Sequence, residues 1–398
     1  MTLPPFEGGV PAKARWLCEW LRSRGHSVTL SYYATFGHDS DLNAPSWRAA
    51  IGAKPDSRTG SCFDGVRSVA VGCWLPELEF SYYLDSSRWR DLIRTHDRHI
   101  AVGGTPLISY PLVTSGVPHL VWCATSTAGD RSDRERSMSW MRSIFDRIFI
   151  APQLHRMERR ILDGSGSIYG VSRHTAKALN TEVESSTAAK RSAYRIGYLP
   201  IPVDISALRP PETPPHSGIV GFAGRLNDSR KNLIALIKAV SLAREAGVGV
   251  RAVLAGDAPG SELRAAVEQH GLSDHVKFLG KVDRNRLQQF YREIDIFAIP
   301  SRQEGLCIAG IEAMACGVPV VSTRCGGPED YVRSGETGLL VGFEPKEIAD
   351  GIAAIAHNRA LRNAMSGNAL AVVERQYAPD VFYRLIENAW RSVWNEDP

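Results

Sequence analysis

The sequence contains no long uninterrupted hydrophobic run, and none approaches the roughly 18 apolar residues that a membrane-spanning helix needs. Its N-terminus lacks the charged segment and following apolar stretch of a secretory signal. The seven cysteines include no Cys-x-x-Cys pair, and several stand among apolar residues. We therefore expect reduced thiols inside the core, and a cytoplasmic protein that is neither membrane-spanning nor stabilised by disulfides.

Strong charge imbalance is also absent, because the net charge is only +4 and most of it is dispersed along 398 residues. This dispersion argues against an extended nucleic-acid interface and supports only a mild preference for anionic ligands. No low-complexity tract is present, and 43% hydrophobic with 23% charged residues is typical of a folded chain. The length is sufficient for two domains with separate cores.

Short apolar runs alternate with helical patterns along the chain, which predicts βαβ units and parallel sheets. In the first half the predicted strands are 27–32, 66–71, 100–102, 119–122 and 148–150. In the second half they are 219–223, 252–255, 276–279, 296–299 and 318–321. The proline-rich stretch Arg209–Pro215 between the two halves is the candidate interdomain linker.

The most informative stretch runs from Ser301 to Gly317 and carries two glutamates, Glu304 and Glu312. It follows a run of strand length and becomes rich in helix formers, so Glu304 falls in a strand-to-helix turn, where backbone N–H groups attract phosphate. Carboxylates accept hydrogen bonds from hydroxyls. At about 1.5 Å per residue the two carboxylates are about 12 Å apart, which suits a sugar and a ribose flanking a diphosphate. The alternatives are a helix-capping Glu304 and a solvated Glu312.

Two cations six positions apart, Arg225 and Lys231, bracket another turn between a predicted strand and a predicted helix. A guanidinium and a flexible ammonium at one strand end suit a diphosphate. The alternative is a solvated loop that happens to be basic.

The second half of the chain also contains motifs in a characteristic order, and these are Gly221–Leu226 with Lys231–Asn232, Ser301–Gly317, Gly317–Val321, Gly326–Glu329 and Gly338–Val341. Together they resemble the donor-binding half of the retaining glycosyltransferases of family 4. The first half resembles that family more loosely, through Gly25–Thr29 and Gly170–Ala176.

This resemblance implies the α/β GT-B fold, with two Rossmann-like doubly wound domains facing a cleft. The implied division is an acceptor-side domain over 1–205, a nucleotide-sugar-binding domain over 206–375, and a last helix over 376–398 that returns to the first domain. The implied reaction moves a hexose from a UDP-sugar or GDP-sugar to a hydroxyl of an acceptor, which is a small molecule, a glycan or a lipid-linked group. The resemblance further implies retention at the anomeric carbon and a reaction without a bound metal or cofactor.

The resemblance also assigns roles to individual residues. Arg225 and Lys231 stabilise the leaving diphosphate, and Glu304 contacts the donor hexose. Glu312 binds the ribose. The remaining donor-binding positions are Gly8, Gly9, Gly224, Gly305, Leu306 and Cys307. Cys307 stands where the family often has glycine, and Glu329 is either another pocket carboxylate or a first-turn helix residue.

Two features depart from the family pattern. Only Met1–Leu3 precede the first glycine-rich loop, so the usual first strand is missing or is supplied by residues upstream. The family's N-domain histidine is also absent, because Cys123–Thr127 follows the strand that normally carries it, and hydroxyls of Thr125 or Ser126 are the candidates for that space. These departures leave open a catalytically silent nucleotide-sugar-binding or scaffold protein.

The arginine-rich segment Arg131–Leu162, with aromatic and aliphatic residues interleaved, has two interpretations. Its apolar residues bury against the domain, or they form an interfacial helix that contacts anionic lipid weakly, at the inner face of a membrane.

Overall fold

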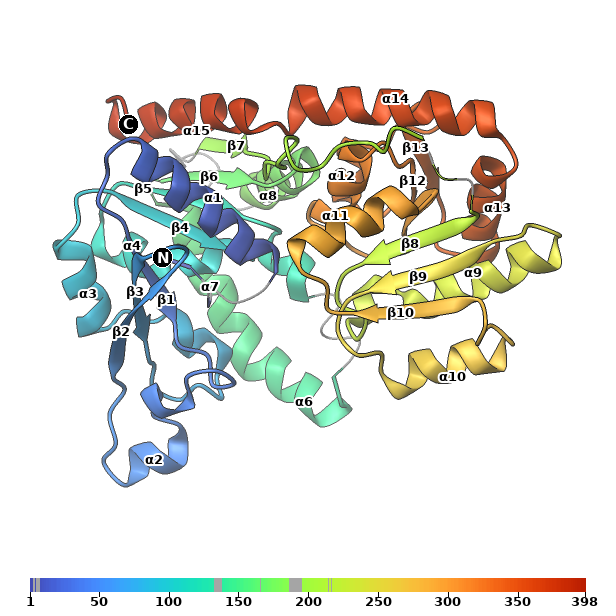
Figure 1. Ribbon diagram of the computed structural model, residues 1–398. Coiled ribbons are helices and arrows are strands. Elements are labelled where there is room, and N and C mark those ends of the chain that lie inside the picture. The colour runs from blue at the N-terminus through green and yellow to red at the C-terminus, as the bar shows by residue number, and fades with distance from the viewer. Residues whose placement is uncertain are drawn as a thin grey trace. The chain divides into compact units, whose positions relative to one another are not determined.

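A computed structural model describes residues 1–2, 4, 8–131, 138–164, 166–185, 195–213, 215 and 217–398. The chain forms two compact units, and Figure 1 shows their helices and strands. Unit 1 contains Met1–Leu199 and Tyr383–Pro398, and unit 2 contains Pro200–Phe382. Among the described residues, no helix combines the length and apolarity that crossing a bilayer requires.

Unit 1 is built on parallel strands, in the orders β1-β3-β2 and β4-β5-β6-β7. The strands are β1 (Thr29–Tyr33), β2 (Ser57–Cys62), β3 (Val66–Val71), β4 (His99–Gly103), β5 (His119–Cys123), β6 (Ser167–Gly170) and β7 (Arg195–Tyr198). Its helices are α1 (Gly9–Ser23), α2 (Ser46–Ala50), α3 (Ser87–Arg94), α4 (Tyr110–Ser115), α6 (Trp140–Phe145), η4 (Asp146–Ile150), α7 (Ala151–Leu162) and α8 (Arg173–Ser185). Of the strands in the described residues, only β2 runs antiparallel to its neighbour, and its largely exposed, polar sequence gave no strand signal.

The position of the missing first strand is occupied by the first two residues. Thr2 bridges Tyr32 of β1 and Val102 of β4 in parallel, and so joins the two groups of strands. The backbone N–H of Thr2 donates to Ser31 O at 2.8 Å, and Val102 N donates to Met1 O at 2.8 Å. Thr2 therefore forms one isolated bridge with each of these two strands.

One predicted strand is wrong. Residues 148–150 belong to η4, a π-helical turn that continues α6 into α7 without a break. The apolar residues of this region repeat at helical spacing, as Ile144 and Ile148 do, and a three-residue apolar run could not distinguish a strand from a helix.

Unit 2 is a six-stranded parallel sheet with the order β10-β9-β8-β11-β12-β13. The strands are β8 (Ile219–Ala223), β9 (Arg251–Ala255), β10 (Val276–Gly280), β11 (Ile296–Ile299), β12 (Val320–Thr323) and β13 (Gly338–Val341). The helices are α9 (Leu233–Glu245), α10 (Ser261–Gln269), α11 (Arg284–Glu293), α12 (Ile308–Ala315), α13 (Pro345–Ala356) and α14 (Arg359–Gln376). The predicted strands of this half are confirmed within one or two residues at each end.

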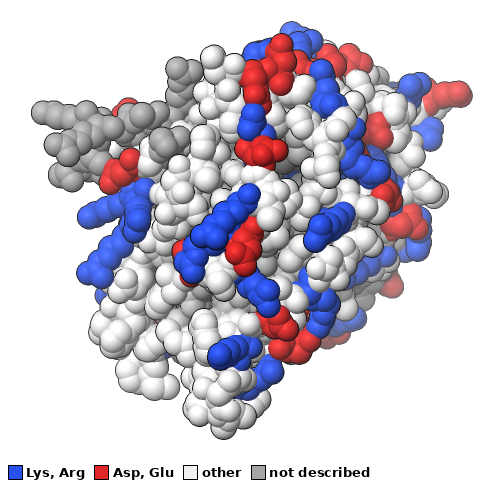
Figure 2. Space-filling model, turned by 90° about the vertical axis from the view of Figure 1, so that its left-hand side faces the viewer, with Lys and Arg blue, Asp and Glu red and all other residues white. Residues whose placement is uncertain are grey.

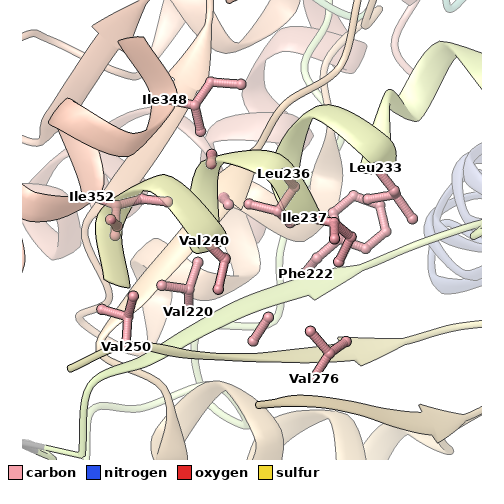
Figure 3. Close-up of a cluster of buried hydrophobic side chains, with 14 of the residues drawn as sticks. Val220, Phe222, Leu233, Leu236, Ile237, Val240, Val250, Val276, Ile348 and Ile352 are labelled. Carbon is pink, nitrogen blue, oxygen red and sulfur yellow. The ribbon is translucent and has the colours of Figure 1, made fainter. Parts of the chain in front are cut away.

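The core of unit 2 lies between the sheet and the helices α9 and α13 (Figure 3). Leu236, Ile237 and Val240 of α9 pack there with Val220 of β8 and Ile352 of α13, and all five are completely buried. At about 25 cal/mol per Å² of apolar surface, each such side chain stabilises the fold by about 1.5–3 kcal/mol relative to exposure. This packing fixes the sheet whose strand ends carry the candidate site.

The boundary between the units falls before the proline-rich stretch proposed as a linker. Pro210 and Pro211 line a small pocket of unit 2 with Tyr291 and Gly317, and carbons of Pro210 lie 3.4 Å from the position of a Cβ added to Gly317. These prolines pack on unit 2, which the chain has already entered at Pro200.

The C-terminal helix α15 (Pro379–Trp394) begins in unit 2 and continues, from Tyr383, in unit 1. There Trp390 is 1% exposed and packs edge-on against Trp20 of α1, with ring centroids 6.0 Å apart. Figure 2 shows one face of the molecule, on which basic and acidic side chains are interspersed, in keeping with the small net charge.

Candidate functional site

The candidate site lies where the strand order of unit 2 reverses. From β8 the chain proceeds outward through β9 and β10, and it then returns to β11 on the other side of β8 and proceeds through β12 and β13. In doubly wound sheets the crevice outside the carboxyl ends of the two central strands is the ligand site. Gly224 and Arg225 follow β8, and Ser301–Glu304 follows β11. The fold thus brings together two loops about 75 residues apart in sequence.

The loop after β8 carries the predicted cations. Lys231 ends the turn η5 (Ser229–Lys231), and its Cε lies 3.9 Å from the position of a Cβ added to Gly224. Arg225 Nη2 lies 2.6 Å from Asp228 Oδ2, and the Arg230 guanidinium also binds this carboxylate, at 3.0 and 2.9 Å. Burial alone would raise the pKa of Asp228, but the two arginines lower it overall. Asp228, which the sequence did not single out, therefore anchors this loop.

The loop after β11 is held by the neighbouring loop after β12. Glu304 and Gly326 form an isolated parallel bridge, in which Glu304 N donates to Cys325 O at 2.7 Å and Gly327 N donates to Glu304 O at 2.8 Å. The approach is so close that a Cβ on Gly327 would lie 2.3 Å from Gly305 O. Glu304 is thus fixed in extended backbone before the helix and lies in the predicted turn.

The helix α12 begins only at Ile308, after Cys307, which has a left-handed backbone with φ 62°. The rise of 1.5 Å per residue therefore does not apply to all eight positions between the two glutamates. A left-handed conformation favours glycine, the residue that the family often has at this position. In the described part of the chain, the backbone N–H groups of Leu306 and Cys307 make no hydrogen bond and can receive an anion.

The predicted cation and the predicted sugar-binding carboxylate meet directly. Lys231 Nζ donates to Glu304 Oε1 at 2.6 Å, and Ser301 Oγ donates to the same oxygen at 2.6 Å. The two charged side chains are 17% and 9% exposed. Burial alone would lower the pKa of Lys231, but the Glu304 carboxylate outweighs it and the pKa is raised. Lys231 is therefore held in place as a cation beside the left-handed Cys307.

The second glutamate, Glu312, lies on α12 and accepts a hydrogen bond from Tyr291 of α11. The Tyr291 hydroxyl donates to Glu312 Oε2 at 2.8 Å, and Tyr291 is completely buried. Burial raises the pKa of Glu312, although this hydrogen bond opposes the effect. A freely solvated Glu312 does not fit these contacts. Tyr291 was missed because a buried aromatic in a helix reads as core.

Glu329 has a structural role. Its Oε1 accepts from Gly326 N at 3.1 Å, so the side chain caps a free backbone N–H at the start of the short helix η6 (Gly327–Asp330). The first-turn interpretation of this residue accounts for its contacts.

The remaining predicted residues, Gly8 and Gly9, belong to unit 1. Gly8 precedes α1 with φ 107°, a conformation that glycine adopts without strain, and Gly9 is the first helical residue. Their part in donor binding stays a prediction.

The space near the absent N-domain histidine contains a buried lysine that the sequence gave no reason to choose. Lys13 Nζ donates to Gly103 O at 2.8 Å and to Trp122 O at 3.2 Å, at the carboxyl ends of β4 and β5. Lys13 is completely buried, and burial lowers its pKa to about 7. In the loop after β5, Ser126 is 4% exposed and its Oγ accepts from Gly129 N at 3.1 Å.

Within the described ranges, no three His, Cys, Asp or Glu side chains are grouped so that they could hold a metal ion. The sequence-based expectation of a reaction without metal stays a prediction.

One family of known proteins matches the part of the chain that carries these residues. Residues 206–372 match the family described as "Glycosyl transferases group 1". This part of the chain is a group 1 glycosyltransferase domain. It contains Arg225, Lys231, Glu304 and Glu312.

Curated relatives match over part of the chain. A D-inositol 3-phosphate glycosyltransferase of Actinosynnema mirum is 36% identical over 166 residues, which cover 39% of this chain and 40% of the relative. The lipopolysaccharide core biosynthesis mannosyltransferase LpsB of Rhizobium meliloti is 35% identical over 151 residues, which cover 36% and 42%. The chain thus matches about two fifths of the length of these relatives.

Solved structures match over nearly the whole chain. Sucrose-phosphate synthase from Thermosynechococcus elongatus has a TM-score of 0.72 at 20% identity, with 98% of this chain and 94% of that chain covered. Anabaena HepE, solved in complex with UDP and glucose, has a TM-score of 0.68 at 17% identity, with 98% of both chains covered. The expected α/β GT-B fold is confirmed, and the glycosyltransferase domain is its second Rossmann-like part.

Proposed function

We propose that this protein is a retaining hexosyltransferase that moves a hexose from a nucleoside diphosphate sugar to an acceptor hydroxyl. The observation that carries the proposal is the contact of Lys231 with Glu304 at the strand-order reversal of a glycosyltransferase domain. There a cation, a carboxylate and unpaired N–H groups are available to one ligand with phosphate and hydroxyl groups.

In this proposal the donor diphosphate lies against Lys231 and the N–H groups of Leu306 and Cys307. Breaking the bond to the anomeric carbon moves negative charge onto the diphosphate. Fixed donors and cations stabilise that charge without having to reorganise. Arg225, whose side chain is 68% exposed, closes over the phosphates from the solvent side.

Glu304 has a second role toward the sugar. Its Oε1 accepts from Lys231 and Ser301, and within the described residues Oε2 has no hydrogen bond, so this oxygen can accept from a hexose hydroxyl. Glu312 uses Oε2 for Tyr291 and can offer Oε1 to the ribose. Retention follows from displacement on the same face of the sugar, assisted by the leaving phosphate, as in the family that the sequence resembles.

The donor is a UDP-sugar or a GDP-sugar. HepE, a protein of the same fold, has been solved with UDP and with UDP-glucose, and LpsB is a mannosyltransferase. The base and the sugar of the donor are therefore identified by the assay below, in which several acceptors are also compared.

The test is release of free nucleoside diphosphate when UDP-sugars and GDP-sugars are offered with sugar, inositol phosphate and lipid-linked acceptors. An active enzyme releases the diphosphate only with both substrates, and NMR of the product gives the anomeric configuration of donor and product. Excess chelator should leave the rate unchanged. Donor binding without turnover with any acceptor would favour the catalytically silent binding protein, and inversion would refute the retaining mechanism.

A further inference from the structure

The largest group of exposed apolar side chains in the described part of the chain lies on α6 and η4. Figure 1 shows α6 and α7 as one continuous helical run, with η4 between them. Trp140 is 72% exposed and Met141 is 63% exposed. The full set, called the exposed stripe below, is Trp140, Met141, Ile144, Phe145, Ile148 and Phe149.

These six residues form one continuous surface. Their spacing repeats every four residues, so at about 100° per residue they fall on one side of the helix. Phe145 and Phe149 are in contact, with ring centroids 5.1 Å apart. A single exposed apolar residue is ordinary, whereas a contiguous apolar group marks an interaction surface.

The stripe is not left exposed by poor packing of the helix. Along α7 the same helical run buries its apolar side, where Leu154 and Ile161 are 0% exposed in the core of unit 1. At η4, Asp146 is 2% exposed, and its carboxylate accepts a hydrogen bond from the guanidinium of the buried Arg131. Arg131 Nη1 also lies 3.7 Å from Glu79 Oε2. The helix is thus firmly held on one side while the stripe faces outward.

The exposed charges on the helical run α6–η4–α7 are of one sign. Within 138–162 the exposed charged side chains are Arg142, Arg147, Arg156, Arg159 and Arg160, with the exposed His155 beside them. The two acids of this range, Asp146 and Glu158, are buried. On a helical projection Arg142 and Arg147 fall at the two borders of the stripe, where their long side chains can reach charged groups above an apolar layer.

From this arrangement we propose that the exposed stripe binds the surface of a bilayer that contains anionic lipids. The apolar residues enter the boundary between headgroups and acyl chains, and the arginines bind the anionic headgroups. A second copy of the chain is a poorer occupant, because it would bring five more arginines against the first five. The proposal does not depend on the transferase activity and concerns a surface of unit 1 alone.

The test is sedimentation of the full chain with vesicles of phosphatidylcholine containing about 30% phosphatidylglycerol, at low ionic strength. We expect the wild type to sediment with these vesicles. With pure phosphatidylcholine, or with the salt raised to about 0.5 M, binding should fall by on the order of tenfold, because the headgroup attraction is lost or screened.

Two double variants separate the apolar and the charged contributions. W140E/I148E places negative charges within the stripe. R142E/R147E reverses the sign of the charge at its two borders while the apolar residues remain. Each should reduce binding by on the order of tenfold. The matched control is Phe343→Glu, since Phe343 is exposed apolar surface of unit 2, and this variant should bind as the wild type does. Circular dichroism establishes that each variant is folded.

The proposal is overturned if the wild type stays in the supernatant, or if folded W140E/I148E and R142E/R147E both sediment like the wild type. Sedimentation velocity without lipid tests the other occupant. A dimer that W140E/I148E dissociates would assign the stripe to contact between copies instead.

Discussion

At the scale of single residues, the best-defined functional pair is Lys231 with Glu304. We predict that Lys231→Ala and Arg225→Ala each lower turnover by about a hundredfold or more, because each removes a fixed charge that stabilises the departing diphosphate. The measurement is steady-state kcat with the donor identified by screening. Lys238→Ala is the control, since Lys238 is an exposed lysine on α9. Near-normal kcat in both site variants would show that these cations do not act in the reaction.

Cys307 is predicted to be strained. A residue other than glycine at φ 62° costs about 1–2 kcal/mol, so Cys307→Gly should raise the free energy of unfolding by about 1 kcal/mol. Cys307→Ala keeps the Cβ and should give no such gain, so the difference between the two variants isolates the backbone. Urea unfolding of both proteins is the measurement, and equal stabilities would contradict the prediction.

Lys13 should make stability depend on pH. Its pKa is lowered to about 7 in the fold from 10.5, so above pH 7 the unfolded state binds more protons and the free energy of unfolding rises with pH. The slope is at most about 1.4 kcal/mol per pH unit. Lys13→Met lacks this contribution. Because both proteins have the same seven cysteines, the difference between their slopes in urea unfolding from about pH 7 to about pH 8.5 isolates Lys13. Equal slopes would mean that Lys13 keeps its ordinary pKa.

At the scale of elements, the turn between β11 and α12 depends on its contact with the loop after β12. Gly327→Ala would place a Cβ 2.3 Å from Gly305 O, so we expect it to displace the Glu304 backbone and to lower kcat/KM by about tenfold or more. It should also destabilise the protein. Gly367→Ala in α14 is the matched control, because a Cβ there meets open space and the change should stabilise by about 0.5–1 kcal/mol. Unchanged kcat/KM in G327A would show that the close approach of Gly327 to Gly305 is not needed to position Glu304.

The sequence was a reliable guide to elements where period and length agreed. Five of the six strands of unit 2 were found, because they are apolar and bounded by turns, whereas β13 was noted only as a motif of the family. Residues 148–150 were misassigned because three apolar residues carry no period of their own. Strand β2 was missed because its residues, Ser57–Cys62, are largely exposed and polar. Its place at the edge of the sheet comes from pairing with β3, which no local pattern encodes.

At the scale of the whole molecule, the C-terminal helix ties the end of the chain to unit 1. Trp390 is 1% exposed and lies against Trp20, His26 and Trp394. We predict that Trp390→Ala destabilises the protein by about 3–5 kcal/mol, whereas nucleotide binding by unit 2 is unchanged. Differential scanning calorimetry measures the first effect, and isothermal titration with UDP and GDP at low temperature measures the second. Loss of nucleotide binding in the folded variant would contradict the prediction.

The sequence by itself determined the kinds of elements, the two-domain α/β class and the residues that end the strands, because turn chemistry and hydrophobic period are local properties. It also placed Glu304 in a turn and two cations after another strand. Only the tertiary structure decided that these turns are neighbours, since β8 and β11 pair although residues 224–295 separate them in the chain. The partners of the charged groups, Asp228, Ser301 and Tyr291, were decided in the same way, because a contact between distant segments depends on strand order and burial and not on the sequence around each residue.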